Sequence, residues 1–230
     1  MMEIIDLSQE IYEGMPVYKD LPQVKMSIHK SHEEWMGIKD PSTKTPAVHK
    51  IELGEHTGTH VDAINHMEIQ HRGKSIDIMP LSMFYTEGIC LDFSYKGLKE
   101  LIHTDEIETA CNNAGITIKK GDTVLFYTNH YRKHFNGDNW GNGPGITKEA
   151  ARWLGEQQIA AFGVETMSPG IPGISNKEVH HICGEMNFTH YENLINLHLL
   201  IGRGRFRFIG LPLKIKGGTG SPVRAVAVFE

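Results

Sequence analysis

The sequence is poor in features that would mark it as an exported, membrane-bound or nucleic-acid-binding protein. It has only three cysteines in 230 residues, at 90, 111 and 183. They are never spaced as C-x-x-C, which argues against a disulfide framework or a thiolate zinc site. No apolar run is long enough to cross a membrane. A formal charge of −5 gives no electrostatic reason to bind nucleic acid or an anionic membrane surface.

The opening segment, MMEIIDLSQEIYEG, lacks the basic, apolar and small-residue order of a secretory signal. With so few cysteines, this predicts a cytoplasmic protein. The chain has 40% hydrophobic residues, no internal repeat, and no linker rich in Pro, Gly and Ser. We therefore predict one globular domain over residues 1–230.

One segment is open to two interpretations. In GRGRFRFIG (202–210), three arginines alternate with glycine and phenylalanine. Such a strip could stack RNA bases. Alternation with a period of two is also typical of a strand that has arginines on one face and packed aromatics on the other, and we favour the strand.

The middle and second half alternate between strand and helix patterns. Thr147 is a predicted N-cap for KEAARWLGEQQ, and Ser175 with Glu178 forms the S-x-x-E box that opens a second helix. Such alternation predicts an α/β fold, with a mixed β-sheet and flanking helices because the first ninety residues are rich in strands. The predicted later strands are 122–128, 159–166, 188–194, 205–215 and 223–229.

The densest group of functional side chains is HTGTHVDAINH, residues 56–66, with three histidines and one aspartate. Its Thr, Gly and Val residues are poor helix formers, so we predict an extended or loop conformation at a strand end. Residues two apart on an extended chain share a face, which would put His56, His60 and Asp62 together. Gly58 between them would leave room for an ion and water. Imidazoles and a carboxylate suit zinc, manganese or ferrous iron.

A structural interpretation remains for any single histidine, namely a turn or strand residue hydrogen-bonded to the backbone. The complete H-x3-H-x-D-x3-H array favours the metal site instead. Rival signatures are absent from the sequence: it contains no HExxH, no GxSxG, no P-loop, and no GxGxxG placed between a strand and a helix.

The array resembles the H-x-G-T-H-x-D-x-x-x-H signature of the metal-dependent hydrolases called cyclases, a family that includes bacterial kynurenine formamidase and isatin hydrolase. Four further segments match the family in order along almost the whole chain. They are IIDLSQEIYEGMPVY, GPGITKEAARWL, HHICGEMNFTHYENLINL and GLPLKIKGGTGSPVRAVAV. The resemblance implies a swivelling β/β/α fold and a homodimer or homotetramer.

The resemblance also implies a set of metal ligands. His56, His60 and Asp62 match the family residues that hold a first divalent ion. His180 and Glu192 match the late histidine and glutamate that complete a second position in members with two ions. Zinc is the expected metal and manganese the alternative, with one or two ions per chain.

His66 matches the family's catalytic acid/base, and Tyr18 matches an aromatic residue that lines the substrate pocket. Residue type alone would make Tyr18 an ordinary half-buried tyrosine. The chain departs from the family at Ile64, where a proline is usual, so the backbone that aims His66 is less constrained. The late histidine is doubled, and spacing alone favours His180 over His181.

These parts suit hydrolysis of a carbon–nitrogen bond, because a divalent ion activates water and a free histidine moves the proton. The activity implied is that of an arylformamidase, which converts N-formylkynurenine to kynurenine and formate. Alternatives are hydrolysis of a cyclic amide or lactone, as by isatin hydrolase, and a metal-containing binding protein without turnover. A pure binder has no need of His66. The aromatic loop 130–140 suits either an aryl substrate or an oligomer interface.

Overall fold

The computed structural model describes residues 2–36, 45–66 and 68–230. The main sheet has nine strands in the order β1-β13-β11-β5-β7-β9-β10-β4-β12. The central four, β5, β7, β9 and β10, are parallel, and the outer strands join them antiparallel. The strands are β1 (Glu3–Asp6), β4 (His60–Asp62), β5 (Tyr85–Asp92), β7 (Thr123–Tyr127), β9 (Ala161–Val164), β10 (Thr189–Glu192), β11 (Phe206–Ile209), β12 (Gly220–Pro222) and β13 (Val226–Phe229).

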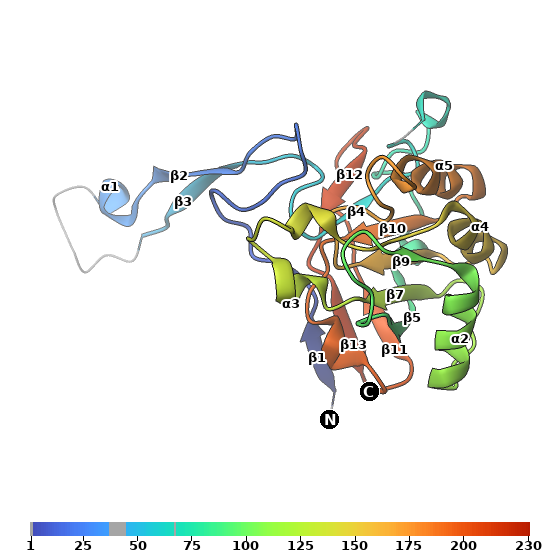
Figure 1. The fold of residues 1–230 in the computed structure, drawn as a ribbon. Helices are drawn as coiled ribbons and strands as arrows, with labels where there is room; N and C mark the ends of the chain where they lie inside the picture. The colour runs from blue at the N-terminus through green and yellow to red at the C-terminus, as the bar shows by residue number, and fades with distance from the viewer. Residues whose placement is uncertain (1, 37–44, 67) are drawn as a thin grey trace.

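Helices cover one side of this sheet (Figure 1). They are α2 (Thr104–Ala114), α4 (Lys148–Glu156) and α5 (Asn176–Met186). Thr147 caps α4 as predicted, since its hydroxyl accepts a hydrogen bond from the backbone N–H of Ala150 at 3.1 Å. A short pair, β6 (Leu101–Ile102) and β8 (Gly145–Ile146), lies outside the main sheet. A further α-helix, α3 (His130–His134), follows β7.

The central strands explain why the sheet has a core on each side. β7 is buried along its whole length, and its side chains alternate between the faces. Val124 and Phe126 pack into the core under the helices, and Leu125 and Tyr127 pack into the core on the opposite face. The second core also contains residues of β1, β4, β11 and β13, so the sheet curls around it.

The N-terminal strand helps to close the curl. Beyond β1, Ser8 forms an isolated bridge with Leu194, just past β10. The Leu7 N–H donates to Ala225 at 2.9 Å, and the Leu7 carbonyl accepts from Ile195 at 2.9 Å. The start of the chain thus joins two strands that are far apart in the sheet order. The predicted α/β fold with a mixed sheet and flanking helices is confirmed; that one domain spans 1–230 stays a prediction.

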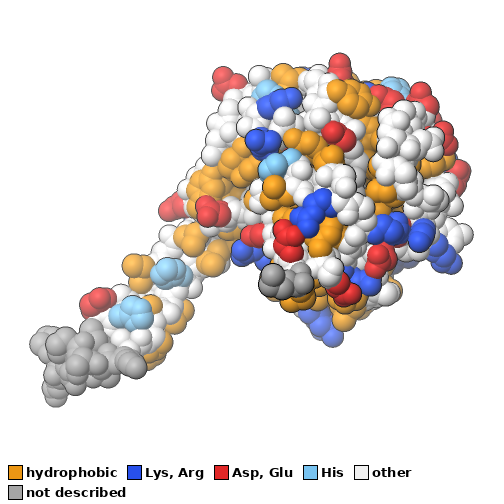
Figure 2. Space-filling view, turned by 90° about the horizontal axis from the view of Figure 1, so that it is seen from below, with side chains coloured by type: hydrophobic (Ala, Val, Ile, Leu, Met, Phe, Trp, Pro, Cys, Tyr) orange, Lys and Arg blue, Asp and Glu red, His pale blue; other side chains and the backbone are white. Residues whose placement is uncertain are grey.

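A hairpin projects from this body (Figure 1). It consists of β2 (Lys25–Lys30), antiparallel to β3 (Val48–Glu52), with the short helix α1 (His32–Met36). Viewed from another side, hydrophobic side chains lie along it (Figure 2). Every described residue of β3 is exposed. The hairpin therefore contributes no buried layer to the cores of the body.

Two sequence predictions differ from the structure in detail. The helix predicted after Ser175 begins there, but not through a capping box. The Ser175 hydroxyl instead accepts from the Ile171 N–H at 3.0 Å and donates to the Ile146 carbonyl at 2.9 Å. The strand predicted over 205–215 ends at Ile209, because the following residues turn toward β12, a strand that the sequence analysis did not identify.

The second half of the arginine-rich segment is a strand, as favoured, but residues 202–205 precede it outside regular structure. Phe206 and Phe208 are buried in β11, while the arginines face acids. Arg205 forms an ion pair with Asp122 at 2.5 Å, and the others pair with Glu3 and Glu87. Ion pairing and packing thus account for the alternation. Among the described residues, no helix is both long and apolar enough to cross a membrane.

Candidate metal centre

Two neighbouring strands present four functional side chains on one face. β4 and β10 are antiparallel, with Glu192 opposite His60 and Tyr191 opposite Val61. Val61 and Tyr191 are fully buried in the core inside the curled sheet. Because successive strand residues point to opposite faces, the even-numbered residues point the other way, toward α5. These are His60, Asp62, His190 and Glu192.

The turn before β4 supplies another imidazole. His56 Nδ1 lies 2.8 Å from Asp62 Oδ1, and His56 Nε2 lies 3.0 Å from the Thr219 hydroxyl. Of the two predicted conformations, extended or loop, the structure has the loop at His56, because residues 55–59 form turns and bends before the strand begins at His60. Gly58 adopts a left-handed φ of 60°, and a Cβ there would lie 3.2 Å from Met15 rather than beside an ion. Gly58 therefore permits the turn and does not create the ion's space.

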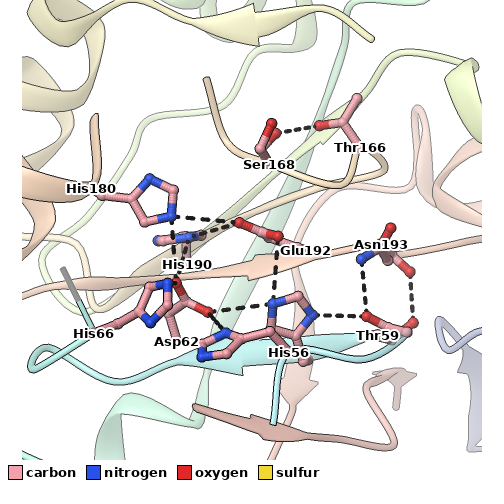
Figure 3. Close-up of polar contacts among 12 residues, drawn as sticks. His56, Thr59, Asp62, His66, Thr166, Ser168, His180, His190, Glu192 and Asn193 are labelled. Atoms are coloured by element: carbon pink, nitrogen blue, oxygen red, sulfur yellow. Dashed lines mark hydrogen bonds and ion pairs between the residues drawn. The ribbon is translucent and has the colours of Figure 1, made fainter. Parts of the chain in front are cut away.

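Asp62 is the centre of the cluster (Figure 3). Its Oδ1 lies 3.4 Å from His60 Nε2, in addition to the contact with His56. Its Oδ2 lies 3.3 Å from His190 Nε2, 3.5 Å from His180 Nε2 and 3.7 Å from His66 Nε2. The two oxygens thus face two different groups of imidazoles.

Backbone carbonyls orient two of these imidazoles. His60 Nδ1 lies 2.8 Å from the Gly58 carbonyl, and His180 Nδ1 lies 2.7 Å from the Asn176 carbonyl. A carbonyl can only accept, so each Nδ1 carries a hydrogen, and in the neutral tautomer with that hydrogen Nε2 has the free lone pair. Both Nε2 atoms point toward Glu192, at 3.4 Å from Oε2 for His60 and 3.8 Å from Oε1 for His180. This is the orientation required of metal-ligating histidines.

The doubled late histidine has two different environments. His180 is buried and faces the cluster, whereas His181 is more exposed and its Nδ1 contacts Glu68. Adjacent helical residues point about 100° apart, so only one can reach the site. The geometry favours His180 as the ligand, in agreement with the choice by spacing.

Among the residues that the structure describes, two groups of donor atoms are compact enough to hold an ion. Within each, the atoms lie within 4.8 Å of one another. The first group consists of Asp62, His180, His190 and Glu192. The second consists of His56, Asp62 and His66. The second group therefore contains His66, predicted as the acid/base, in the place where the sequence analysis expected the ligand His60.

The electrostatics of the cluster fit a cation. Burial opposes ionisation of Asp62, but the imidazoles of His66, His190 and His56 outweigh burial and hold its pKa well below the usual range. Burial opposes protonation of His190, but Asp62 and Glu192 raise its pKa well above the usual value. The carboxylates that favour a positive charge on His190 would also favour a divalent ion. Metal binding to such donors is coupled to proton release.

His66 is positioned by a turn rather than by a proline. Its backbone N–H donates to the Ala63 carbonyl at 3.0 Å, and Asn65 donates to Lys74 at 3.2 Å. Ile64, in the usual proline position, packs against the core inside the sheet. Burial is the main cause that lowers the pKa of His66 to about 4, against the opposing charge of Asp62. His66 is therefore neutral at physiological pH and able to accept a proton.

The cluster lies at the wall of a cavity of about 260 Å³. Tyr18 lines this cavity and is half-buried, and burial followed by the charge of Glu192 raises its pKa. A second cavity of about 420 Å³ shares the wall formed by residues 16–19 and 167–168, and it extends to Trp140. Trp140 stacks on His130 with ring centroids 5.2 Å apart. The aromatic loop thus contributes to a cavity beside the cluster.

The sequence analysis missed three residues of this site. Thr219 contacts His56, and Asn193 donates to the Gly58 carbonyl at 3.0 Å; neither carries a recognisable signal. His190 does carry one. It lies two residues before Glu192 in a predicted strand, and period two puts such neighbours on one face.

Known proteins resemble this chain over most of its length. The sequence model of the Cyclase family matches residues 5–170, more than half of the chain. The chain belongs to the cyclase family. Relatives of this cyclase include a kynurenine formamidase of Salinibacter ruber, 24% identical over 98% of this chain and 97% of the relative. An isatin hydrolase of Roseibium aggregatum is 25% identical over 99% of this chain and 92% of the relative.

Solved structures of related proteins have the same fold. Isatin hydrolase A from Ralstonia solanacearum matches with a TM-score of 0.85 and 28% identity, covering 100% of this chain and 92% of the other. A potential metal-dependent hydrolase with cyclase activity matches with a TM-score of 0.75 and 26% identity, covering 100% of this chain and 99% of the other. Together with the His, Asp and Glu cluster, these relatives identify the cyclase described here as a hydrolytic enzyme with a site for a divalent metal.

Proposed function

We propose that this enzyme hydrolyses the carbon–nitrogen bond of a small aromatic amide, with arylformamidase activity as the best candidate. The observation that carries the proposal is the juxtaposition of the Asp62 cluster, His66 and the cavity that they line. Relatives named kynurenine formamidase and isatin hydrolase both support amide hydrolysis.

We assign the metal ligands as the sequence resemblance implies. His56, His60 and Asp62 would hold one ion, and Asp62 with His180 and Glu192 would hold a second. Imidazole and carboxylate donors fit zinc or manganese, and zinc is our first choice. A divalent ion bound by such donors lowers the pKa of water toward 7 and polarises a carbonyl oxygen.

The protein's own part in the reaction is proton transfer and positioning. The neutral imidazole of His66 accepts the proton of the attacking water and delivers it to the leaving nitrogen as the carbon–nitrogen bond breaks. Hydrolysis of a formamide in this way yields formate and an amine. Asp62 Oδ2, 3.7 Å from His66 Nε2, stabilises the imidazolium that forms between the two transfers.

The cavity supports a substrate with an aryl group. Trp140 lines the second cavity, and Tyr18 lines both cavities. Lys19 also lines both, which favours a substrate that carries a carboxylate. N-formylkynurenine has one and isatin has none, so Lys19 favours the formamidase over the isatin hydrolase alternative.

A direct test is steady-state hydrolysis of N-formylkynurenine and of isatin by the enzyme loaded with zinc or with manganese. We expect turnover of N-formylkynurenine to exceed that of isatin and to disappear after chelation. The Lys19→Met variant should raise KM for the charged substrate only. A panel of amides, imides and lactones with no turnover would instead support the binding protein without catalysis.

We also propose that the enzyme is a homodimer or homotetramer. The β2–β3 hairpin supports this, because an isolated two-stranded hairpin is marginally stable in water. It exposes Ile28, Ile51 and Trp35, with exposed fractions of 65%, 53% and 47%. Light scattering after size-exclusion chromatography gives the assembly mass, and Ile28→Lys with Ile51→Lys is expected to reduce it. A monomeric mass for the unmodified enzyme contradicts the proposal.

A further inference from the structure

His190 occupies a position that the family resemblance did not assign. Its Nε2 lies 3.3 Å from Asp62 Oδ2 and 3.2 Å from Glu192 Oε1. Its ring is perpendicular to that of His180, with the centroids 4.7 Å apart. All four side chains are buried, and their donor atoms form one compact group. His190 therefore meets the same two carboxylates as His180, from another direction (Figure 3).

The distances in this group match those between ligands of one ion. In a tetrahedral zinc site with bonds of about 2.0–2.1 Å, neighbouring donors lie roughly 3.3 Å apart. The pairs formed by His190 measure 3.3 and 3.2 Å, and those formed by His180 measure 3.5 and 3.8 Å. A single charge-assisted hydrogen bond from His190 would be shorter, about 2.7–2.9 Å, and would be directed at one oxygen.

The other side of the His190 ring has only a weak polar neighbour. Nδ1 is buried without a hydrogen-bond partner of normal geometry, and the buried thiol of Cys183, a weak hydrogen-bonding group, lies beside the ring. The ring lies against Phe162, with an interplanar angle of 25° and centroids 5.5 Å apart. The aromatic contact and the two carboxylates thus fix the ring with Nε2 turned toward the donor group.

We propose that His190 is a fourth protein ligand of the ion held by Asp62, His180 and Glu192. This inference rests on the proposed metal-dependent function. It assigns a structural role to one ion position and a catalytic role to the other. Four protein ligands make a closed site, typical of a structural ion. The position of His56, His60 and Asp62 has three protein ligands. It therefore leaves one coordination position open for water or substrate, as catalytic sites do.

The test compares His190→Gln with His181→Gln. His181 is a matched control because it contacts Glu68 outside the cluster. Each protein is stripped with a chelator, its fold is checked by circular dichroism, and zinc affinity is measured by titration against a competing chelator. Loss of an outer-shell partner costs about 10–100-fold in affinity. We expect His190→Gln to weaken one of the two sites by more than that range, and His181→Gln to leave both unchanged.

A second measurement does not depend on the variant folding. The unmodified protein is labelled with 15N-histidine and loaded with cadmium-113, and the spin coupling between cadmium and the ring nitrogens is recorded. We expect a coupling to His190 Nε2. Absence of that coupling, or an affinity loss within the outer-shell range, overturns the proposal. If His190 is a ligand but no substrate is hydrolysed, the proposed function fails and this inference stands.

Discussion

The two sides of the metal centre are built in different ways. One side comes from eleven consecutive residues, in which a turn leads into β4 and brings His56, His60, Asp62 and His66 together. The other side comes from α5 and β10, which follow more than a hundred residues later, and it reaches the site only because β10 pairs with β4. The first side is a local property of the sequence, whereas the second depends on the complete sheet.

Removing a ligand from the local side should have the largest effect. His60 is 2% exposed, and its Nε2 faces both carboxylates. His60→Ala is expected to remove the ion of the open position and most activity together, because a ligand of that position is lost. Elemental analysis beside a turnover assay checks this. Full metal content in the variant would show that His60 is not a ligand.

The next largest effect is expected at His66, on the same side. Loss of a general acid/base typically costs about 10²–10⁴-fold in rate. His66→Ala should fall in that range while it retains its metal. If metal and activity fall in proportion, His66 is instead a ligand, as its place in the compact group with His56 and Asp62 would allow.

His66 should also control the pH dependence. Burial lowers its pKa to about 4, so the imidazole is neutral, and able to act as a base, above that pH. Activity is expected to fall as pH decreases through about 4 in the unmodified enzyme, and this acid limb should change in His66→Ala. A pH–rate profile of kcat/KM for both proteins measures it. The same acid limb in both would assign the titration to another group.

On the distant side, Glu192→Gln should have a smaller effect. An amide is a weaker ligand than a carboxylate for these cations, so we expect fewer ions per chain but an ion retained at the position of His56 and His60. Glu185→Gln is the control, since Glu185 pairs with Arg152 on the surface. Unchanged metal content in Glu192→Gln would contradict the two-ion assignment.

The smallest effect concerns the link between the two sides. The Thr59 hydroxyl donates to the Asn193 carbonyl at 2.6 Å and accepts from the Gln9 N–H at 2.8 Å. Thr59→Val leaves both buried groups without this partner, which should cost about 1–3 kcal/mol of stability. Thr109→Val, on the exposed face of α2, should change stability by less than about 0.5 kcal/mol. Equal unfolding midpoints would show that the link adds no stability.

The same contrast explains how much could be predicted from the sequence. The α/β fold and α4 followed from local patterns, since periodicity and caps act within a few residues. The cluster at 56–66 was also visible, because its spacing lies within one segment. His190 and Thr219 were missed, because strand pairing and a loop from the end of the chain bring them to the site. For Ser175, the local pattern predicted the correct helix start but the wrong hydrogen bond, because Ile146 and Ile171 compete for its hydroxyl.

The crowding of four donors into one short segment has a consequence for folding. An unfolded chain keeps His56, His60, Asp62 and His66 within eleven residues, so it can already bind a cation weakly. A metal stabilises a native state only by the excess of its affinity for that state over its affinity for the unfolded one. The early segment thus contributes affinity in both states. The donors of α5 and β10, which approach only after the sheet has formed, supply most of the coupling between metal binding and folding.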